Sequence, residues 1–224
     1  MKIKGDTVKD NKRLLSGRLY RIDISRTIVF EEKDTDDVVH INFQINDGQY
    51  GIYGNEYKPS FVEDQGSKKA DILALVIDDK HRRYSSWVFD VKKTIGGEDV
   101  ICHLVEQLIE SVKHKKAITT YLEEYEEEAH VGYITRCLQH DRIQETILRK
   151  RSYLEKEKEN AKRMPRLIGL DVRRRLLREE ARLKVLTAFQ NDRMEIGKDI
   201  VEIEKHISEE SDGRFLYYLN AVCL

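Results

Sequence analysis

The sequence predicts an α/β protein in which a mixed β-sheet is flanked by helices and is followed by a long C-terminal helical hairpin. Three observations predict it. Residues 18–92 contain short segments that alternate apolar and polar side chains or are rich in β-branched ones, as strands are. A helical spacing of apolar residues begins near Glu98. From about residue 139 charged residues dominate, with only a thin apolar line at helical spacing.

The composition limits the size and organisation of the protein. A chain of 224 residues is long enough for one sizeable domain with an appendage. We therefore expect a core over residues 1–138 and a charged helical hairpin with an apolar tail over residues 139–224. Charged residues make up 36% of the chain, which favours a solvated helical region. The formal net charge is −1, so any affinity for nucleic acid must come from a local patch.

The cysteines and the apolar segments indicate the compartment. Cys102, Cys137 and Cys223 are widely spaced and form no CxxC pair, which argues against a zinc site or a disulfide framework. A reducing, cytoplasmic location fits this usage best. No apolar segment approaches the length of a membrane span, so we expect no membrane partner.

Several strands are expected before residue 95. "RLYRIDI", "TIVFEE" and "VVHINFQI" are typical of strands, and Asn46–Gly48 predicts a hairpin turn. Two strongly apolar strands follow at about 71–77 and 86–92. The polar loop between them predicts a β-hairpin.

The hairpin is expected to gather three charged side chains on one face. Residues opposed in an antiparallel pair point to the same face, and their numbers sum to a constant. A sum of 161 or 163 places Asp71 opposite Asp90 or Lys92, and Lys92 shares a face with Asp90 because strands repeat every two residues. Both faces are otherwise apolar, as expected of central strands covered on both sides. The charged face also carries Leu73, Leu75, Ile77 and Val88, and the opposite one carries Ile72, Ala74, Val76, Trp87, Phe89 and Val91.

The rest of the chain is predicted to be mainly helical. A helix should begin near Glu98, and the acidic run Glu123–Glu128 should be a solvated helix end before the strand "HVGYITRCL". A helix from about 140 should pair with a second one from about 171 to 208. The apolar tail after residue 214 should dock against another surface. The stripe of the second helix would include Ile196, Ile200, Ile203 and Ile207.

The charged triplet has the parts needed to hydrolyse a phosphodiester. Ionised groups in a core are costly unless they are paired or bind a metal. Asp71 and Asp90 offer the oxygen ligands that Mg²⁺ or Mn²⁺ prefers, and the Val91 carbonyl can add a third. A metal ion lowers the pKa of bound water and polarises a phosphoryl oxygen. Lys92 can orient that water and offset charge that grows on the phosphate.

These residues resemble the signature of the PD-(D/E)xK nuclease superfamily. The signature is an acid that opens one strand, then (D/E)xK on the next strand, then a helix; here these are Asp71, "DVK" at 90–92, and the helix from about 98. The resemblance implies a restriction-endonuclease-like core over about residues 40–138 and Mg²⁺- or Mn²⁺-dependent cleavage of DNA, with RNA as the alternative. It also implies site roles for Gln107, where RecB-like members often carry glutamine, and for an upstream glutamate, Glu63 in preference to Glu56.

Two functions from different classes follow. The first is a nuclease, which the resemblance places as a subunit of a multi-protein defence or restriction system, such as an antiviral one. The second is a non-catalytic interaction subunit in which the nuclease fold is a scaffold and the helical hairpin is a docking arm. Either way, the C-terminal helices are expected to contact a protein partner or a second copy. The basic face at Arg173–Arg175 and Arg178 is a solvated face by default, with DNA or an acidic partner as the alternative.

Overall fold

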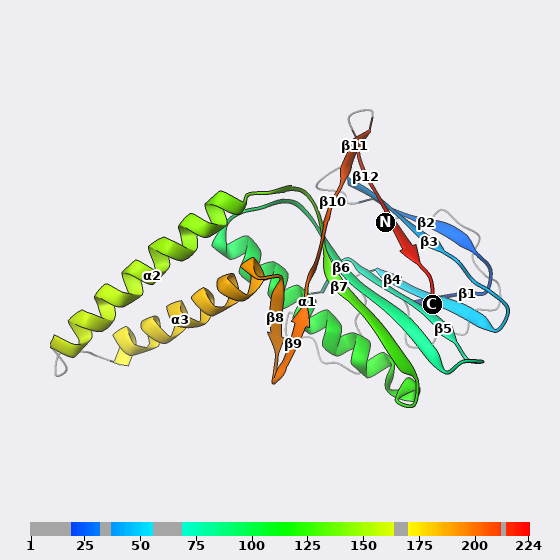
Figure 1. Cartoon of the computed structure of the whole chain (residues 1–224), viewed down its shortest axis with the longest axis horizontal. Coiled ribbons are helices and arrows are strands. Elements are labelled where there is room, and N and C mark those ends of the chain that lie inside the picture. Colours follow the sequence, from blue (N-terminus) through cyan, green and yellow to red (C-terminus); the bar gives the residue numbers. More distant parts are fainter. Residues whose placement is uncertain (1–18, 32–36, 56–68, 164–169, 212–213) are drawn as a thin grey trace.

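The computed structural model describes residues 19–31, 37–55, 69–163, 170–211 and 214–224 (Figure 1). Glu56 and Glu63, the upstream glutamates considered from the sequence, lie outside these residues. The described part is mixed α/β, as predicted, and its largest sheet has the strand order β1-β4-β5-β6-β7-β10. The pairs β6–β7 and β7–β10 are parallel and the others are antiparallel. The strands are β1 (Leu19–Ile22), β4 (Gln49–Asn55), β5 (Ile72–Asp78), β6 (Arg83–Ile95), β7 (Glu126–Leu138) and β10 (Glu204–Ile207).

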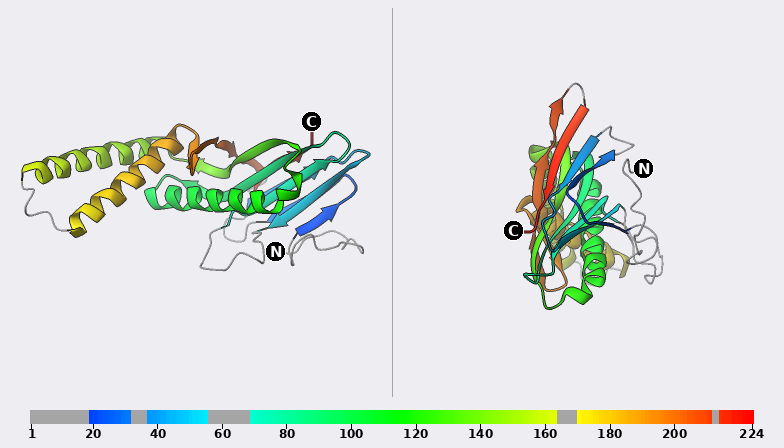
Figure 2. Two further views of the ribbon diagram at one scale, coloured as in Figure 1. Left: turned by 90° about the horizontal axis from the view of Figure 1, so that it is seen from below. Right: turned by 90° about the vertical axis from the view of Figure 1, so that its right-hand side faces the viewer.

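A second sheet and three long helices complete the described architecture. The second sheet has the order β11-β12-β3-β2, and β8 pairs with β9 in a separate hairpin. These strands are β2 (Arg26–Glu31), β3 (Asp37–Phe43), β8 (Arg193–Ile196), β9 (Asp199–Glu202), β11 (Glu209–Ser211) and β12 (Arg214–Ala221). The helices are α1 (Glu98–Ile118), α2 (His140–Arg163) and α3 (Leu170–Gln190), and a single 3₁₀ turn spans Thr120–Leu122. Helices α2 and α3 contact each other and project beyond the two sheets (Figures 1 and 2).

The β5–β6 hairpin lies at the centre of the core and has the predicted register. Ile72 is opposite Phe89 and Asp78 is opposite Arg83, so opposed numbers sum to 161. Every residue of β5 is buried, because both faces of the sheet are covered. The face of Leu73 and Leu75 packs in one apolar cluster with α1, and the face of Ile72 packs in another cluster with the second sheet. The predicted assignment of the two faces is therefore confirmed.

The turn at Asn46–Gly48 does not close a hairpin. The local turn signal is real, since Gly48 has a φ of +84° and the Gln49 N–H donates to the Asn46 carbonyl at 3.0 Å. However, β3 pairs with β2 and β12, whereas β4 pairs with β1 and β5. The turn carries the chain from one sheet to the other. The predicted hairpin is wrong because turn residues determine the local bend of the chain and not the partner of each strand.

The acidic run Glu123–Glu128 is a helix end only in its first part. Glu123 and Glu124 are exposed and lie in the turn that follows the 3₁₀ helix, whereas Glu126–Glu128 belong to a strand. Strand β7 begins at Glu126 and lies parallel to β6, with Ser85 beside Glu128. The Ser86 hydroxyl donates to Glu127 at 2.7 Å, and Glu127 also forms an ion pair with the buried Lys115 of α1. Ser86 of β6 and Lys115 of α1 therefore bind the Glu127 carboxylate, which water would solvate at an exposed helix end.

The second helix of the hairpin is shorter than predicted. Helix α3 ends at Gln190, and the predicted helical stretch up to residue 208 is instead β8, β9 and β10. Asp192 and Gly197 have φ values of +58° and +64°, which an α-helix cannot contain. The four isoleucines do not form one buried stripe. Ile196 and Ile203 are buried, whereas Ile200 is 66% exposed and Ile207 is 60% exposed.

The C-terminal region returns to the core, so the division expected at residues 138/139 is not where the structure divides. Strand β10 pairs parallel with β7, and β12 pairs parallel with β3 from Phe215–Asp37 to Ala221–Phe43. The prediction that the apolar tail docks is confirmed by this pairing. Among the described elements after residue 139, α2, α3 and the β8–β9 hairpin lie outside the two large sheets.

Strand β10 can approach β7 closely because residue 132 is a glycine. A Cβ built on Gly132 would lie 2.2 Å from the Glu204 carbonyl oxygen, well inside van der Waals contact. Beside it, the Glu204 carboxylate contacts Nδ1 of His130 at 2.8 Å. The pKa of His130 is raised, first by this hydrogen bond, and that of Glu204 is lowered to about 2, first by the same bond. Backbone proximity and this ion pair together hold β10 in place.

We predict that Gly132→Ala destabilises the protein by about 1–3 kcal/mol, the usual cost of overpacking against a backbone that cannot move away. The matched control is Gly97→Ala, where the nearest atom to a new Cβ is 4.0 Å away. We expect that control to change the free energy of unfolding by less than about 1 kcal/mol. Urea unfolding measures both variants, and equal effects would contradict the role assigned to Gly132.

Candidate active site

The candidate site lies at the end of the β5–β6 ladder where β5 begins. The last opposed pair is Ile72 with Phe89, and Asp71 is the next residue outward. The Val91 N–H donates to the Asp71 carboxylate at 2.7 Å. The Asp71 carboxylate therefore takes the place of the backbone carbonyl that would accept this hydrogen bond if the β5–β6 pairing continued beyond Ile72. Val91 enters the site through its N–H, whereas the sequence suggested its carbonyl.

Asp90 and Lys92 lie on the same strand and contact each other. Asp90 is fully buried, and Lys92 forms an ion pair with its Oδ2 atom. The Lys92 side chain is 23% exposed, so its stem leads from the core to the surface. A buried carboxylate beside a partly exposed ammonium is stabilised by that charge and not by water. The structure thus brings together Asp71, Asp90, Val91 and Lys92, as the register predicted.

The pKa of Asp71 shows how strongly the two acids interact. It is raised to about 8, first because the carboxyl is buried and second because Asp90 carries a negative charge nearby. The Val91 N–H and the Lys92 charge oppose the shift and only partly offset it. At neutral pH the pair of acids therefore retains a proton. A cation that entered the site would displace that proton, because metal binding favours the deprotonated carboxylate.

Helix α1 holds the segment that precedes Asp71. Nε2 of Gln107 donates to the Lys69 carbonyl at 2.8 Å, and the Ala70 N–H donates to the Ser111 hydroxyl at 2.6 Å. Both bonds are made by side chains four residues apart, on one face of the helix. The sequence pointed to Gln107 but missed Ser111. The sequence does mark Ser111, because it is a polar residue one turn beyond Gln107 on a largely apolar face of the helix.

The donors present fit a hard divalent cation. Within the described ranges no three His, Cys, Asp or Glu side chains gather as a metal-ligand group. The carboxylates of Asp71 and Asp90 are nevertheless oxygen donors of the kind that Mg²⁺ and Mn²⁺ prefer. In addition, Oε1 of Gln107 is buried and accepts no hydrogen bond from the described residues. Nε2 of the same side chain binds the carbonyl of Lys69, two residues before Asp71 in the sequence, so this unsatisfied oxygen is a further candidate ligand.

Comparison with known proteins leaves this geometry to be interpreted by itself. No family model matches the chain, and no curated protein or solved structure matches it. Among the described residues, no helix combines the length and the apolar character that crossing a membrane requires.

We predict that Asp71→Asn makes the protein more stable at alkaline pH relative to the parent. The pKa of Asp71 is about 8 in the folded state, against an ordinary value of 3.8. Between these two values the unfolded chain releases a proton that the folded chain retains, so the free energy of unfolding of the parent falls as pH rises. Asparagine has no such proton and can still accept the Val91 N–H.

Urea unfolding between about pH 5 and pH 8.5 measures this effect, because that range spans most of the titration. The stability difference between Asp71→Asn and the parent should increase steadily with pH. Asp90→Asn is the matched control, and it should be less stable than Asp71→Asn because it leaves Lys92 without its buried partner. A difference that stays constant with pH would contradict the interaction assigned to Asp71.

Proposed function

We propose that this protein is a metal-dependent nuclease of the PD-(D/E)xK type that hydrolyses phosphodiester bonds, most simply in DNA. The observation that carries the proposal is the convergence of two buried carboxylates and one lysine at the end of the β5–β6 hairpin. The order β4–β5–β6–α1–β7 supports it, because three antiparallel strands are followed by a helix and a strand parallel to the last of them. A restriction-endonuclease-like core has the order αβββαβ, and these elements match its βββαβ part. The described residues before β4 form strands and no first helix.

Each side chain has a role in this proposal. Asp71 and Asp90 would hold Mg²⁺ or Mn²⁺, with the Val91 carbonyl, Gln107 and Glu63 as weaker members. When bound, the cation supplies an activated water and polarises a phosphoryl oxygen. The Lys92 ammonium orients the water and stabilises the negative charge of the transition state. Helix α1 keeps the 69–71 segment in position through Gln107 and Ser111, so that the carboxylates do not move apart.

One observation favours a second function, in which the chain is a non-catalytic scaffold subunit. Without any cation the site already balances its charges, since Lys92 pairs with Asp90 and the Val91 N–H binds Asp71. A raised pKa keeps Asp71 protonated at neutral pH, which removes the remaining repulsion. In this case α2 and α3 would be a docking arm for a protein partner or a second copy.

We predict that the parent protein cleaves plasmid DNA with Mg²⁺ or Mn²⁺ and does not cleave it with EDTA. Asp71→Ala and Asp90→Ala should each abolish cleavage, because each removes a carboxylate that holds the cation. Agarose gels measure cleavage, and circular dichroism at the assay temperature shows whether each variant is folded. Cleavage by a folded Asp71→Ala protein at the parental rate would contradict the assignment.

We predict that Lys92→Met lowers the cleavage rate by roughly two orders of magnitude, the usual effect of losing one well-placed electrostatic group. The methionine keeps much of the stem and removes the charge. DNA affinity measured with Ca²⁺ should change little, since one contact among several contributes a small share. Because Lys92 pairs with the buried Asp90, the variant should also be less stable. Rates are therefore compared at a temperature where both proteins are folded, and an unchanged rate would favour the scaffold function.

A further inference from the structure

The two projecting helices have a net positive charge, although the protein as a whole does not. Helices α2 and α3 contain fourteen Lys and Arg residues against eight Asp and Glu, in a chain whose net charge is −1. Five of their six glutamates already have ion-pair partners. These pairs are Glu145–Arg149, Glu157–Arg175, Glu159–Arg163, Glu179–Lys150 and Glu180–Lys158. The acids of these helices are therefore largely neutralised by part of the basic set.

The remaining basic side chains are exposed and extend along both helices. In the described part of the chain none of them forms an ion pair, and all are open to solvent. They are Arg142, Arg151, Lys156, Lys162, Arg173, Arg174 and Arg178. Charges of one sign that are distributed over a long surface suit an extended polyanion better than a compact acidic ligand.

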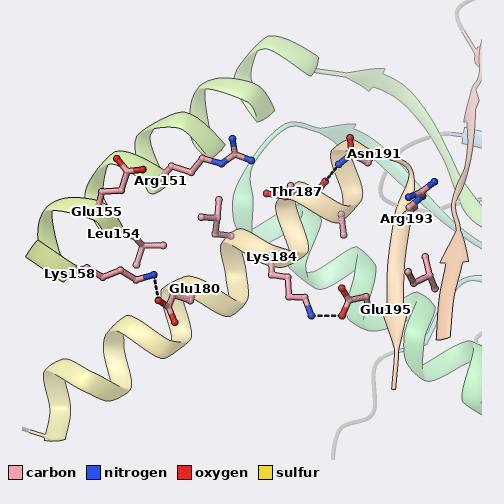
Figure 3. A pocket seen from close by; sticks show the side chains of 13 residues that line it. Arg151, Leu154, Glu155, Lys158, Glu180, Lys184, Thr187, Asn191, Arg193 and Glu195 are labelled. Carbon is pink, nitrogen blue, oxygen red and sulfur yellow. Dashed lines mark hydrogen bonds and ion pairs between the residues drawn. The ribbon is translucent and has the colours of Figure 1, made fainter. Parts of the chain in front are cut away.

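A groove of about 550 Å³ lies between α2, α3 and the β8–β9 hairpin. Leu154, Leu183 and Ala188 line its apolar part. Figure 3 shows that two of its charged pairs are closed within the groove, Lys158 with Glu180 and Lys184 with Glu195.

Two arginines on the groove remain available. Arg151 comes from α2 and Arg193 from β8, and neither guanidinium group makes an ion pair or a hydrogen bond with the described residues (Figure 3). Glu155 is the one acid of the groove that forms no ion pair with the described residues, so the two arginines give the groove a net positive charge. Guanidinium groups bind phosphate oxygens through two parallel hydrogen bonds, which a lysine cannot do.

We propose that this groove binds the sugar–phosphate backbone of a nucleic acid, with Arg151 and Arg193 as its phosphate contacts. The inference rests on the proposed nuclease function, for which it assigns a substrate-binding surface away from the cleavage site.

The connection between the arm and the core supports this arrangement. Lys150 of α2 and Arg182 of α3 both contact Glu98, the first residue of α1. Glu98 lies only six residues after Lys92. Lys92 is near the C-terminal end of β6, away from the β5–β6 turn, and Glu98 follows that end. The arm is therefore attached near the same end of β6 as the proposed cleavage site.

Fluorescence anisotropy with labelled single-stranded DNA, duplex DNA and RNA tests the proposal. All titrations contain EDTA, so binding is measured independently of cleavage. The test protein is the double variant Arg151→Gln/Arg193→Gln. The control is Lys80→Gln/Arg26→Gln, which removes the same charge from the β5–β6 turn and from β2, remote in the chain from the arm. Circular dichroism checks that each protein is folded.

The proposal expects at least a tenfold loss of affinity in the arginine variant and less than a twofold loss in the control. The slope of log K against log salt should become shallower by about one for each phosphate contact removed. Equal losses in both variants would overturn the proposal, because they would reflect total charge. So would parental affinity in the arginine variant, or binding by the parent of a labelled polyglutamate peptide in place of nucleic acid.

The failures of the two proposals are distinguishable. If no metal supports cleavage but binding still depends on Arg151 and Arg193, the nuclease function fails and the groove remains a nucleic-acid site. If the parent cleaves DNA and the arginine variant binds and cleaves normally, the groove assignment fails and the nuclease function stands.

Discussion

The antiparallel pairing of β5 with β6 is the constraint on which the rest of the structure depends. It places two apolar faces back to back, and neither can remain in water. One face needs α1, and the other needs the second sheet, whose inner strand β3 is paired on either side by β2 and β12. The same register stops at Ile72 and Phe89, so the next residues outward, Asp71 and Asp90, have to meet at the boundary of the core.

That boundary explains how a core tolerates three charged side chains. Asp71 replaces a missing backbone acceptor, Asp90 is balanced by Lys92, and the buried pair keeps a proton because its pKa is raised. Under the proposed function, a metal ion would displace this proton, because metal binding favours the deprotonated carboxylate. Apolar residues of similar volume often replace buried ion pairs without loss of stability, so stability alone does not explain the charged cluster.

The sequence predicts well those features that depend on neighbours along the chain. Period-two patterns gave the faces of β5 and β6, and from these followed the meeting of Asp71, Asp90 and Lys92. It fails where the partner is distant. Strand β12 pairs with β3 across more than half the chain, and nothing in "RFLYYLNA" names that partner. The isoleucines from Ile196 to Ile207 are spaced as in a helix, yet positive φ angles at Asp192 and Gly197 turn the chain into strands. Ser111 was missed because its position one turn beyond Gln107, on the buried face of α1, is the only feature of the sequence that marks it.

The helical arm shows why the net charge of the chain conceals its electrostatics. A total of −1 arises from a basic arm and an acidic remainder, so the average describes neither part. The arm is joined to the core by apolar side chains at its base, Ile143, Ile147, Leu186 and Phe189, and by the ion pairs of Lys150 and Arg182 with Glu98. The projecting helices thus keep exposed arginines at a distance from the acids that would neutralise them. Under the proposed function, a nucleic acid would be attracted by the basic arm and repelled by the acidic remainder of the chain, so its binding would be strongest along α2 and α3.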